Sequence, residues 1–164
     1  MTRLRRTTPD DLDFVLALEH HPEQRPFIGQ WTREQHLDTM ARSDREHWII
    51  EDGDSGAPQG YLIAYDVRAA GYGSYIKRIA ITEKSKGVGR EALREFLAHA
   101  FRDQHAASVC LAVRHHNTRA QRAYAAVGFV ERPLTADEWR VFRANVDPVG
   151  DECFVMDVRP SGGS

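Results

Sequence analysis

The sequence predicts an α+β fold in which helices cover both faces of a mixed, mostly antiparallel sheet. Two patterns carry this prediction. Strand-like segments at residues 47–51, 60–67 and 74–81 follow one another with only Asp, Gly and Pro turns between them, which is typical of an antiparallel meander. An amphipathic helical segment and an apolar strand-like segment come next. Strand, helix and strand in this order predict a parallel crossover within the same sheet.

The N-terminal quarter of the chain predicts one strand and two helices. Residues 2–7 form a short strand-like segment, and the sequence TPDD at 8–11 supplies a cap, a proline at the first helical position and acidic first-turn residues. A helix is therefore expected up to about residue 20. The stretch 21–29 contains two prolines and a glycine, which interrupt it. A second helix follows at 32–43, beginning with the Thr and Gln spacing of a capping box.

The C-terminal half predicts two helices and two strands, with one segment left open. Apolar residues at steps of three and four predict a long helix over 87–104. The nearly continuous apolar run 107–113 predicts a strand buried on both faces. A helix is expected at 117–127, between an Asn cap and a terminating glycine. Residues 152–159 predict the last strand, whereas residues 135–143 fit either a short helix or a strand.

The length and charge of the chain restrict its class. We expect one domain over residues 1–160 and a disordered tail at 161–164. The net charge of −2, with both signs interspersed, favours neither nucleic acid nor a membrane surface as a partner. No apolar run is long enough to span a bilayer or resembles a secretory signal, so we expect a cytoplasmic protein. Neither Cys110 and Cys153 nor the histidines have metal-ligand spacing, so no metal is expected.

The most informative segment is IAITEKSKGVGR at residues 79–90, where a strand passes through a basic, glycine-containing turn into a helix. The first amides of a helix lack intrahelical partners, and the helix dipole favours negative charge at this end. Gly87 and Gly89 leave room for close approach, and Lys84, Lys86 and Arg90 add positive charge. The segment therefore predicts a binding site for a phosphate-bearing ligand.

A dinucleotide is one candidate ligand, because residues 87–92 match the G-x-G-x-x-A pattern. A dinucleotide-binding fold needs an acidic residue at the end of the following strand to hold the ribose. That strand ends here in Arg114, His115 and His116. The pattern also follows an antiparallel meander, so we treat the dinucleotide as the minor alternative.

A second motif points to another ligand. The sequence KSKGVG at 84–89 resembles the Q/R-x-x-G-x-G/A motif of the GNAT superfamily of N-acetyltransferases, with Lys84 in the place of Gln or Arg. About thirty residues later, the pattern Asn117, Ala120, Tyr124, Gly128 and Phe129 resembles the second motif of that family. The resemblance extends over residues 60–129. It implies a GNAT-type sheet with splayed fourth and fifth strands and acetyl-CoA as co-substrate.

The resemblance also implies an activity and a set of site residues. The activity is transfer of an acetyl group to a primary amine by direct attack in a ternary complex, the acceptor being a small amine or polyamine, or a protein N-terminus or lysine. A homodimer is an option that the family leaves open. Tyr124 is implied as the general acid at the coenzyme sulfur. The implied cofactor contacts are Ile79, Ala80, Ile81, Lys84, Lys86, Gly87, Val88, Gly89, Arg90, Asn117 and Tyr124.

The base and the acceptor pocket stay open. An aliphatic amine is almost entirely protonated at neutral pH, so a base would assist attack, and Glu83 or Glu51 is the candidate. Phe27 and Trp31 are apolar residues in the broken stretch between the first two helices, where they line an acceptor pocket or pack into the core. Because no base stands out, a non-catalytic acyl-CoA-binding sensor or regulatory module of the same fold is the alternative function.

Overall fold

The computed structural model describes residues 1–83, 86–146 and 152–160. The tail at 161–164 and Lys84 therefore lie outside the described residues. The strands are β1 (Thr2–Arg6), β2 (Arg45–Asp52), β3 (Pro58–Asp66), β4 (Ser74–Ile81), β5 (Val109–Arg114), β6 (Val130–Glu131) and β7 (Cys153–Val158). The helices are α1 (Leu12–Glu19), α2 (Arg33–Ala41), α3 (Val88–Ala98), α4 (Thr118–Ala126) and α5 (Ala136–Asn145), with short turns of 3-10 helix at Pro9–Asp11 and Arg68–Ala70 and of π-helix at His99–Asp103.

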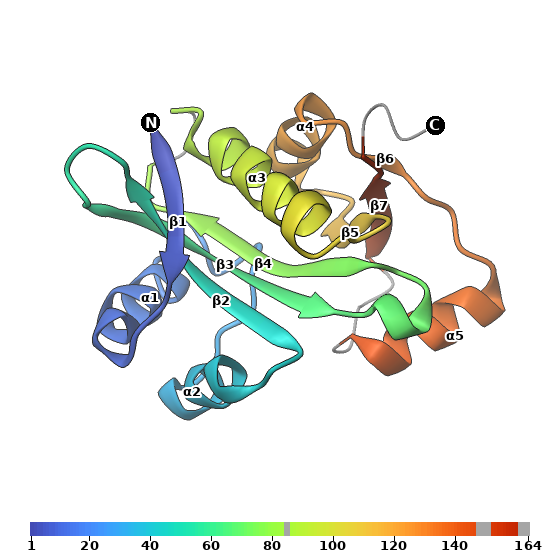
Figure 1. The fold of residues 1–164 in the computed structure, drawn as a ribbon, viewed down its shortest axis with the longest axis horizontal. Coiled ribbons are helices and arrows are strands. Elements are labelled where there is room, and N and C mark those ends of the chain that lie inside the picture. The colour runs from blue at the N-terminus through green and yellow to red at the C-terminus, as the bar shows by residue number, and fades with distance from the viewer. Residues whose placement is uncertain (84–85, 147–151, 161–164) are drawn as a thin grey trace.

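The strands form one sheet in the order β1-β2-β3-β4-β5-β7-β6 (Figure 1). Every neighbouring pair is antiparallel except β4 and β5, which are parallel and are joined through α3. The meander and the crossover that the sequence predicts are therefore both confirmed. The α+β class with a mixed, mostly antiparallel sheet is confirmed with them.

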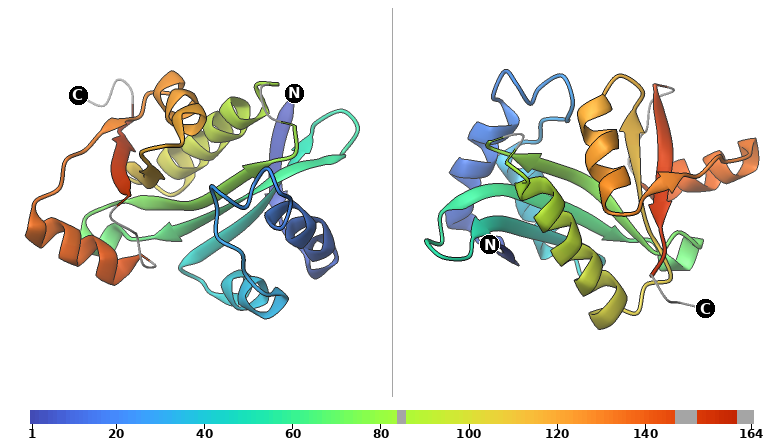
Figure 2. Two further views of the ribbon diagram at one scale, coloured as in Figure 1. Left: turned by 180° about the vertical axis from the view of Figure 1, so that it is seen from behind. Right: turned by 90° about the horizontal axis from the view of Figure 1, so that it is seen from above.

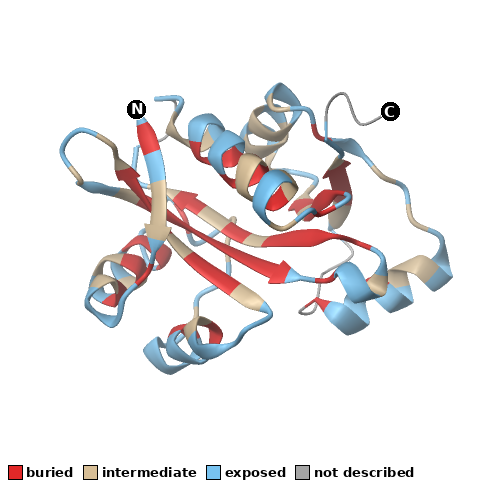
Figure 3. Cartoon of the chain, viewed as in Figure 1, coloured by how far each residue is buried: buried red, intermediate tan, exposed pale blue. Residues whose placement is uncertain are grey.

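Helices cover both faces of the sheet, as Figure 2 shows from behind and from above. One apolar cluster joins the sheet to α1 and α5, through residues such as Leu12, Val15 and Phe142. The other cluster joins the opposite face to α3, through residues such as Leu93 and Phe96. Burial is concentrated in the central strands β3 and β4 between these two layers (Figure 3).

The parallel pair β4 and β5 separates after three residue pairs. Pairing ends at Ile76 opposite Leu111, although β4 continues to Ile81 and β5 continues to Arg114. A β-bulge lies at the same point, because the register with β3 passes from Ile76 to Arg78 and omits Lys77. A bulge bends its strand and increases the local twist. The bend turns the second half of β4 away from β5, which is the splayed geometry expected from the resemblance.

The remaining elements follow the predictions with three differences. The open segment at 135–143 is a helix, because Thr135 accepts from the Glu138 amide and the Glu138 carboxylate accepts from the Thr135 amide. The first turn of the first predicted helix is a 3-10 turn at Pro9–Asp11. The two-residue strand β6 was not predicted, because two residues are too few to show alternation.

Candidate active site

A cleft of about 890 Å³ opens where β4 and β5 separate. It is lined by the diverging halves of both strands, by the first turns of α3 and α4, and by part of the segment between α1 and α2. Among the predicted site residues, those that line this cleft are Phe27, Ile79, Ile81, Glu83, Gly87, Val88, Gly89, Arg90, Asn117 and Tyr124. The tertiary structure thus brings together predicted residues from the segment between α1 and α2, from β4 and the turn after it, from the beginning of α3 and from α4.

One end of the cleft is formed by the beginning of α3. Gly87 precedes the helix with a φ of 79°, a left-handed conformation that only glycine adopts without strain. A Cβ added at Gly89 would lie 3.7 Å from the Cγ1 atom of Ile81, so this glycine keeps the space between α3 and β4 open. The helix beginning therefore faces the cleft with its free amides and without obstructing side chains.

The beginning of α4 forms the adjacent wall. The Oδ1 atom of Asn117 accepts a hydrogen bond from the Ala120 amide at 3.2 Å and caps the helix. Two turns on, the Tyr124 ring packs against Phe129 with ring centroids 5.7 Å apart. Its hydroxyl forms no hydrogen bond with any described residue. Burial raises the pKa of this hydroxyl to about 12, so the phenol is protonated at neutral pH.

Four predicted site residues among those described lie outside the cleft lining, namely Ala80, Lys86, Trp31 and Glu51. Ala80 is buried in the core on the α1 face, and its carbonyl points toward Gly60 of β3. Lys86 is exposed beside the beginning of α3. Trp31 is packed against the α1-side core, with the Arg78 guanidinium 4.7 Å from its ring centroid. Of the two aromatic candidates for the acceptor pocket, only Phe27 lines the cleft, whereas Trp31 packs against the Arg78 guanidinium.

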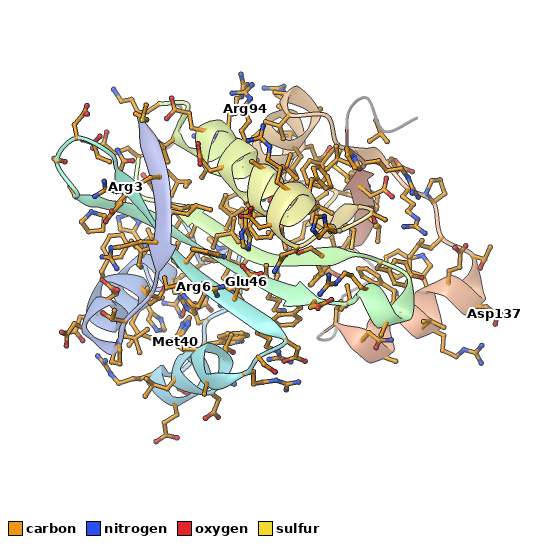
Figure 4. All side chains as sticks on the ribbon, viewed as in Figure 1. Arg3, Arg6, Met40, Glu46, Arg94 and Asp137 are labelled. Carbon is orange, nitrogen blue, oxygen red and sulfur yellow. The ribbon has the colours of Figure 1, made fainter. Side chains whose placement is uncertain are left out.

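Glu51 also lies elsewhere, on β2 near the outer edge of the sheet. Its carboxylate accepts from Arg3 Nε at 2.5 Å and from Arg5 Nε at 2.8 Å. These two arginines lower the pKa of the Glu51 carboxyl. Arg3 projects from the edge strand β1, which is three strands away from β4 (Figure 4). A carboxylate held by two guanidinium groups is a poor proton acceptor, and of the two candidate carboxylates only Glu83 lines the cleft.

A charged residue that the sequence reasoning missed lies in the middle of the cleft wall. Arg78 is only 6% exposed, yet it lines the cleft. Its Nη1 atom donates to Glu19 Oε2 at 2.6 Å, and the Glu19 carboxylate at the end of α1 is completely buried. The signal was present in the sequence, because Arg78 interrupts an apolar strand and Glu19 ends an apolar helix.

Glu19 is also the centre of a buried polar network. Its carboxylate accepts from the Tyr61 hydroxyl at 2.7 Å and from the Trp31 amide at 3.1 Å. The Nε2 atom of His36 lies 3.0 Å from Glu19 Oε2, an ion-pair distance, at an angle that does not satisfy hydrogen-bond geometry. These partners lower the pKa of the Glu19 carboxyl against the opposing effect of burial, so Glu19 is a carboxylate that balances the charge of Arg78.

The network continues through a second histidine. His36 Nδ1 lies 2.9 Å from His47 Nε2, and His47 Nδ1 lies 2.7 Å from the Thr7 hydroxyl. Burial lowers the pKa of His47 to about 3, so its imidazole is neutral at physiological pH. Spacing in the sequence gave no sign of this pair, since the two histidines belong to α2 and β2.

The segment between α1 and α2 spans the mouth of the cleft from one strand to the other. Gln24 Nε2 donates to the Ile81 carbonyl at the end of β4 at 2.7 Å. Arg114 Nη1, at the end of β5, donates to the Pro26 carbonyl. The Phe27 ring lies 5.6 Å from the His116 ring. Residues 21–31 therefore roof the cleft on the α1 side of the sheet.

A cysteine also lines the cleft. Cys153 begins β7 at the end of β5, and its pKa is raised by burial and by the charge of Glu152. Its thiol is therefore protonated at neutral pH and is a weak nucleophile. No group of three or more His, Cys, Asp or Glu side chains suited to a metal ion occurs in the described part of the chain. Within the same residues, no helix is both long and apolar enough to cross a membrane.

Known proteins share this architecture. The sequence model of the family described as "Acetyltransferase (GNAT) domain" matches residues 2–130. The solved structure of AAC(6')-Ib with paromomycin and acetyl-CoA superposes with a TM-score of 0.77 and 20% identity, covering 99% of this chain and 98% of the other. No curated protein matches the sequence significantly.

A second group of similar structures consists of spermidine N-acetyltransferases. The enzyme from Vibrio cholerae in complex with CoA and spermine has a TM-score of 0.76 and 18% identity, over 98% of this chain and 96% of the other. AAC(6')-Ib with coenzyme A and kanamycin has a TM-score of 0.76 and 20% identity, over 97% and 95% of the two chains. These likenesses establish the shared fold.

Proposed function

The chain belongs to the GNAT acetyltransferase family, and on that basis we propose that it is an N-acetyltransferase that moves the acetyl group of acetyl-CoA to a primary amine. Residues 1–160 act as one domain in this proposal. The observation that carries it is the cleft between the separated halves of β4 and β5, with the beginning of α3 at one end and Tyr124 in its wall. Solved structures of this fold that hold CoA together with spermine or kanamycin support an amine acceptor.

Acetyl-CoA would lie along the splayed strands. The pyrophosphate binds at the first turn of α3, where free amides, the helix dipole and Arg90 all favour negative charge. Ile79 and Ile81 line the cleft at the unpaired edge of β4, so the backbone groups of Ile79 and the amide of Ile81, whose carbonyl already accepts from Gln24, pair with the pantetheine amides as an added strand would. Asn117 contacts the same ligand from α4. Lys84 completes this set as a prediction from the motif alone.

The reaction in this proposal is a direct transfer. The neutral acceptor amine attacks the thioester carbon, a C–N bond forms and the C–S bond breaks. The amine gives up a proton to a base, for which Glu83 is the candidate at the cleft rim, directly or through water. The departing sulfur receives a hydrogen bond and then a proton from Tyr124, whose high pKa keeps the phenol protonated until that moment. The protonated thiol of Cys153 argues against a covalent acetyl-enzyme.

Binding and turnover can be tested separately. Isothermal titration measures the Kd of acetyl-CoA, of CoA and of NAD. The rate at which CoA is released in the presence of each amine of a panel measures turnover. We expect acetyl-CoA to bind and NAD not to bind, and we expect acetylated product with at least one amine. Binding without product on any amine would favour the alternative, a non-catalytic acyl-CoA-binding sensor. Binding of NAD without acetyl-CoA would reject the acetyltransferase.

A further inference from the structure

We propose that Arg78 is a specificity-determining residue that binds a carboxylate of the acceptor, so that the acceptor is an amine of the amino-acid type. The inference rests on the proposed function and names the substrate class for the same cleft. Arg78 lines the cleft from β4, one residue beyond the bulge at Lys77 that opens it. Its side chain reaches the α1 face of the sheet, where Glu19 and Trp31 hold it.

The guanidinium is fixed by the protein, but its hydrogen-bonding capacity is only partly used. The side chain of Arg78 is 4% exposed, its Nη1 donates to Glu19, and its plane lies over the Trp31 ring. Nε and Nη2 make no hydrogen bond of ordinary geometry with a described residue, although the Tyr61 hydroxyl, itself bonded to Glu19, is close enough for Arg78 to oppose the rise of its pKa. A planar guanidinium held in this way presents its remaining N–H groups as a preformed fork for a carboxylate.

The opposite wall leaves room for this guanidinium. A Cβ added at Gly29 would lie 2.9 Å from Arg78 Nη2, which is closer than real Cβ atoms approach their neighbours. Gly29 lines the cleft within the segment that roofs it. The φ of Gly29 is not in the left-handed region, so its backbone conformation does not require glycine. What matters at this position is that there is no side chain. Gly29 therefore packs close to Nη2, and any side chain at this position would displace the guanidinium.

The charges around the cleft agree with an anionic acceptor. The Arg78 charge is balanced by Glu19, but Arg114 donates to a carbonyl, and no described carboxylate lies within ion-pair distance of it. Among the described residues that line the cleft, two are acidic and six are basic: Glu83 and Glu152, against Lys77, Arg78, Arg90, Arg114, Arg119 and Arg122. Arg90 belongs to the proposed phosphate site, where the phosphates of acetyl-CoA would offset its charge. The basic side chains at the strand end of the cleft, Arg114 among them, would attract a carboxylate next to the amine.

The first test compares acceptors that differ only at the carboxylate. Alanine, leucine, phenylalanine and lysine are assayed with acetyl-CoA beside their amides and decarboxylated amines, and spermidine is included as a polycation. We expect kcat/KM to be roughly 10- to 100-fold higher for the carboxylate member of at least one set, the range of one charged hydrogen-bonded contact. The inference would be overturned if kcat/KM for each amino acid were no higher than for its amide and its decarboxylated amine. Preference for spermidine, or no acetylation of any amino acid, would also overturn it.

The second test moves the guanidinium without removing its charge. Gly29→Ala places a methyl group against Nη2, and Arg78→Lys keeps a cation for Glu19 but removes the fork. Both variants should raise KM for the preferred amino acid at least tenfold and bring its kcat/KM close to that of the amide. The matched control is Arg132→Lys, because Arg132 also pairs with a carboxylate and lies over an aromatic ring, at Asp157 and Tyr72 outside the cleft.

These measurements separate the inference from the proposed function. A purely structural role of Arg78 would lower activity on the amino acid and its amide by the same factor, and the preference would survive in both variants. That result would overturn the inference while acetyl transfer stands. Failure of acetyl-CoA to bind the unaltered protein in the titration would instead reject the proposed function itself.

Discussion

Arg78 Nη1 lies 2.6 Å from Glu19 Oε2, and both side chains are almost completely removed from solvent. The pair joins the end of α1 to the bent half of β4. Taking two charges out of water is costly, and loss of one partner of such a pair typically costs about 3–5 kcal/mol. The protein therefore keeps a charged group in the cleft wall by burying a carboxylate of opposite charge next to it. This buried partner distinguishes Arg78 from the exposed arginines of the surface.

The network behind Glu19 makes stability depend on pH. The pKa of His47 is about 3 in the folded protein and about 6.5 in the unfolded chain, so the unfolded state binds more protons between these values. The stability that comes from the neutral His47 imidazole is fully present above pH 6.5 and is lost as the pH falls toward 3. We expect the free energy of unfolding in urea to decrease by up to about 1.4 kcal/mol per pH unit between pH 6 and pH 5.

The variant His47→Gln provides the comparison for this prediction. It lacks the titrating imidazole, so its unfolding free energy should change less over the same interval, whatever its absolute stability. An unaltered slope in this variant would show that other groups are responsible for the pH dependence.

Substitutions of the two candidate bases, Glu51 and Glu83, should have different effects on stability and on kcat. Glu51→Gln removes the charge that Arg3 and Arg5 share, which should lower stability by about 1–2 kcal/mol and Tm by roughly 3–8 °C, with kcat unchanged. Glu83→Gln, at the exposed rim of the cleft, should lower kcat at least tenfold with Tm within a few degrees. The opposite pattern, in which Glu51→Gln abolishes turnover in a stable protein, would return the base to Glu51.

Two glycines with the same backbone conformation test the phosphate site. Gly87 and Gly71 have φ values of 79° and 88°, and an added Cβ would have no atom of a described residue within 4 Å at either position. Alanine should therefore cost each about 1–2 kcal/mol of backbone strain. Only Gly87→Ala changes the beginning of α3, so it alone should weaken acetyl-CoA binding in isothermal titration, about tenfold or more. Equal affinity in both variants would contradict phosphate binding at this helix end.

Removing the hydroxyl of Tyr124 tests its role at the sulfur. Tyr124→Phe should lower kcat about 100-fold, within the range for a positioned general acid, and should leave the Kd of acetyl-CoA within about twofold. Tyr72→Phe is the matched control, because the Tyr72 hydroxyl donates to the Glu138 carbonyl away from the cleft. A kcat for Tyr124→Phe equal to that of the control would leave Tyr124 with a packing role only.

Most of the fold could be predicted because its elements carry their own signals. The crossover helix has an apolar stripe within one contiguous segment, and β5 is apolar on both faces because an apolar cluster covers each of them. Residues 135–143 were ambiguous until their packing was known, since the Phe142 ring contacts Tyr75 of β4 and Tyr72 just before that strand. The bulge at Lys77 could not be predicted, because it depends on the register with β3.

The sequence by itself determined the family and the end of the cleft at α3, because strand, turn and helix at residues 79–90 are contiguous and local rules govern them. Only the tertiary structure decided the part of the cleft wall around Arg78. Glu19, Gly29 and Arg78 come from a helix, a loop and a strand, and Arg78 reaches Glu19 and Gly29 only when these elements pack together. The same reason applies to Glu51, whose two arginine partners are supplied by the neighbouring strand β1.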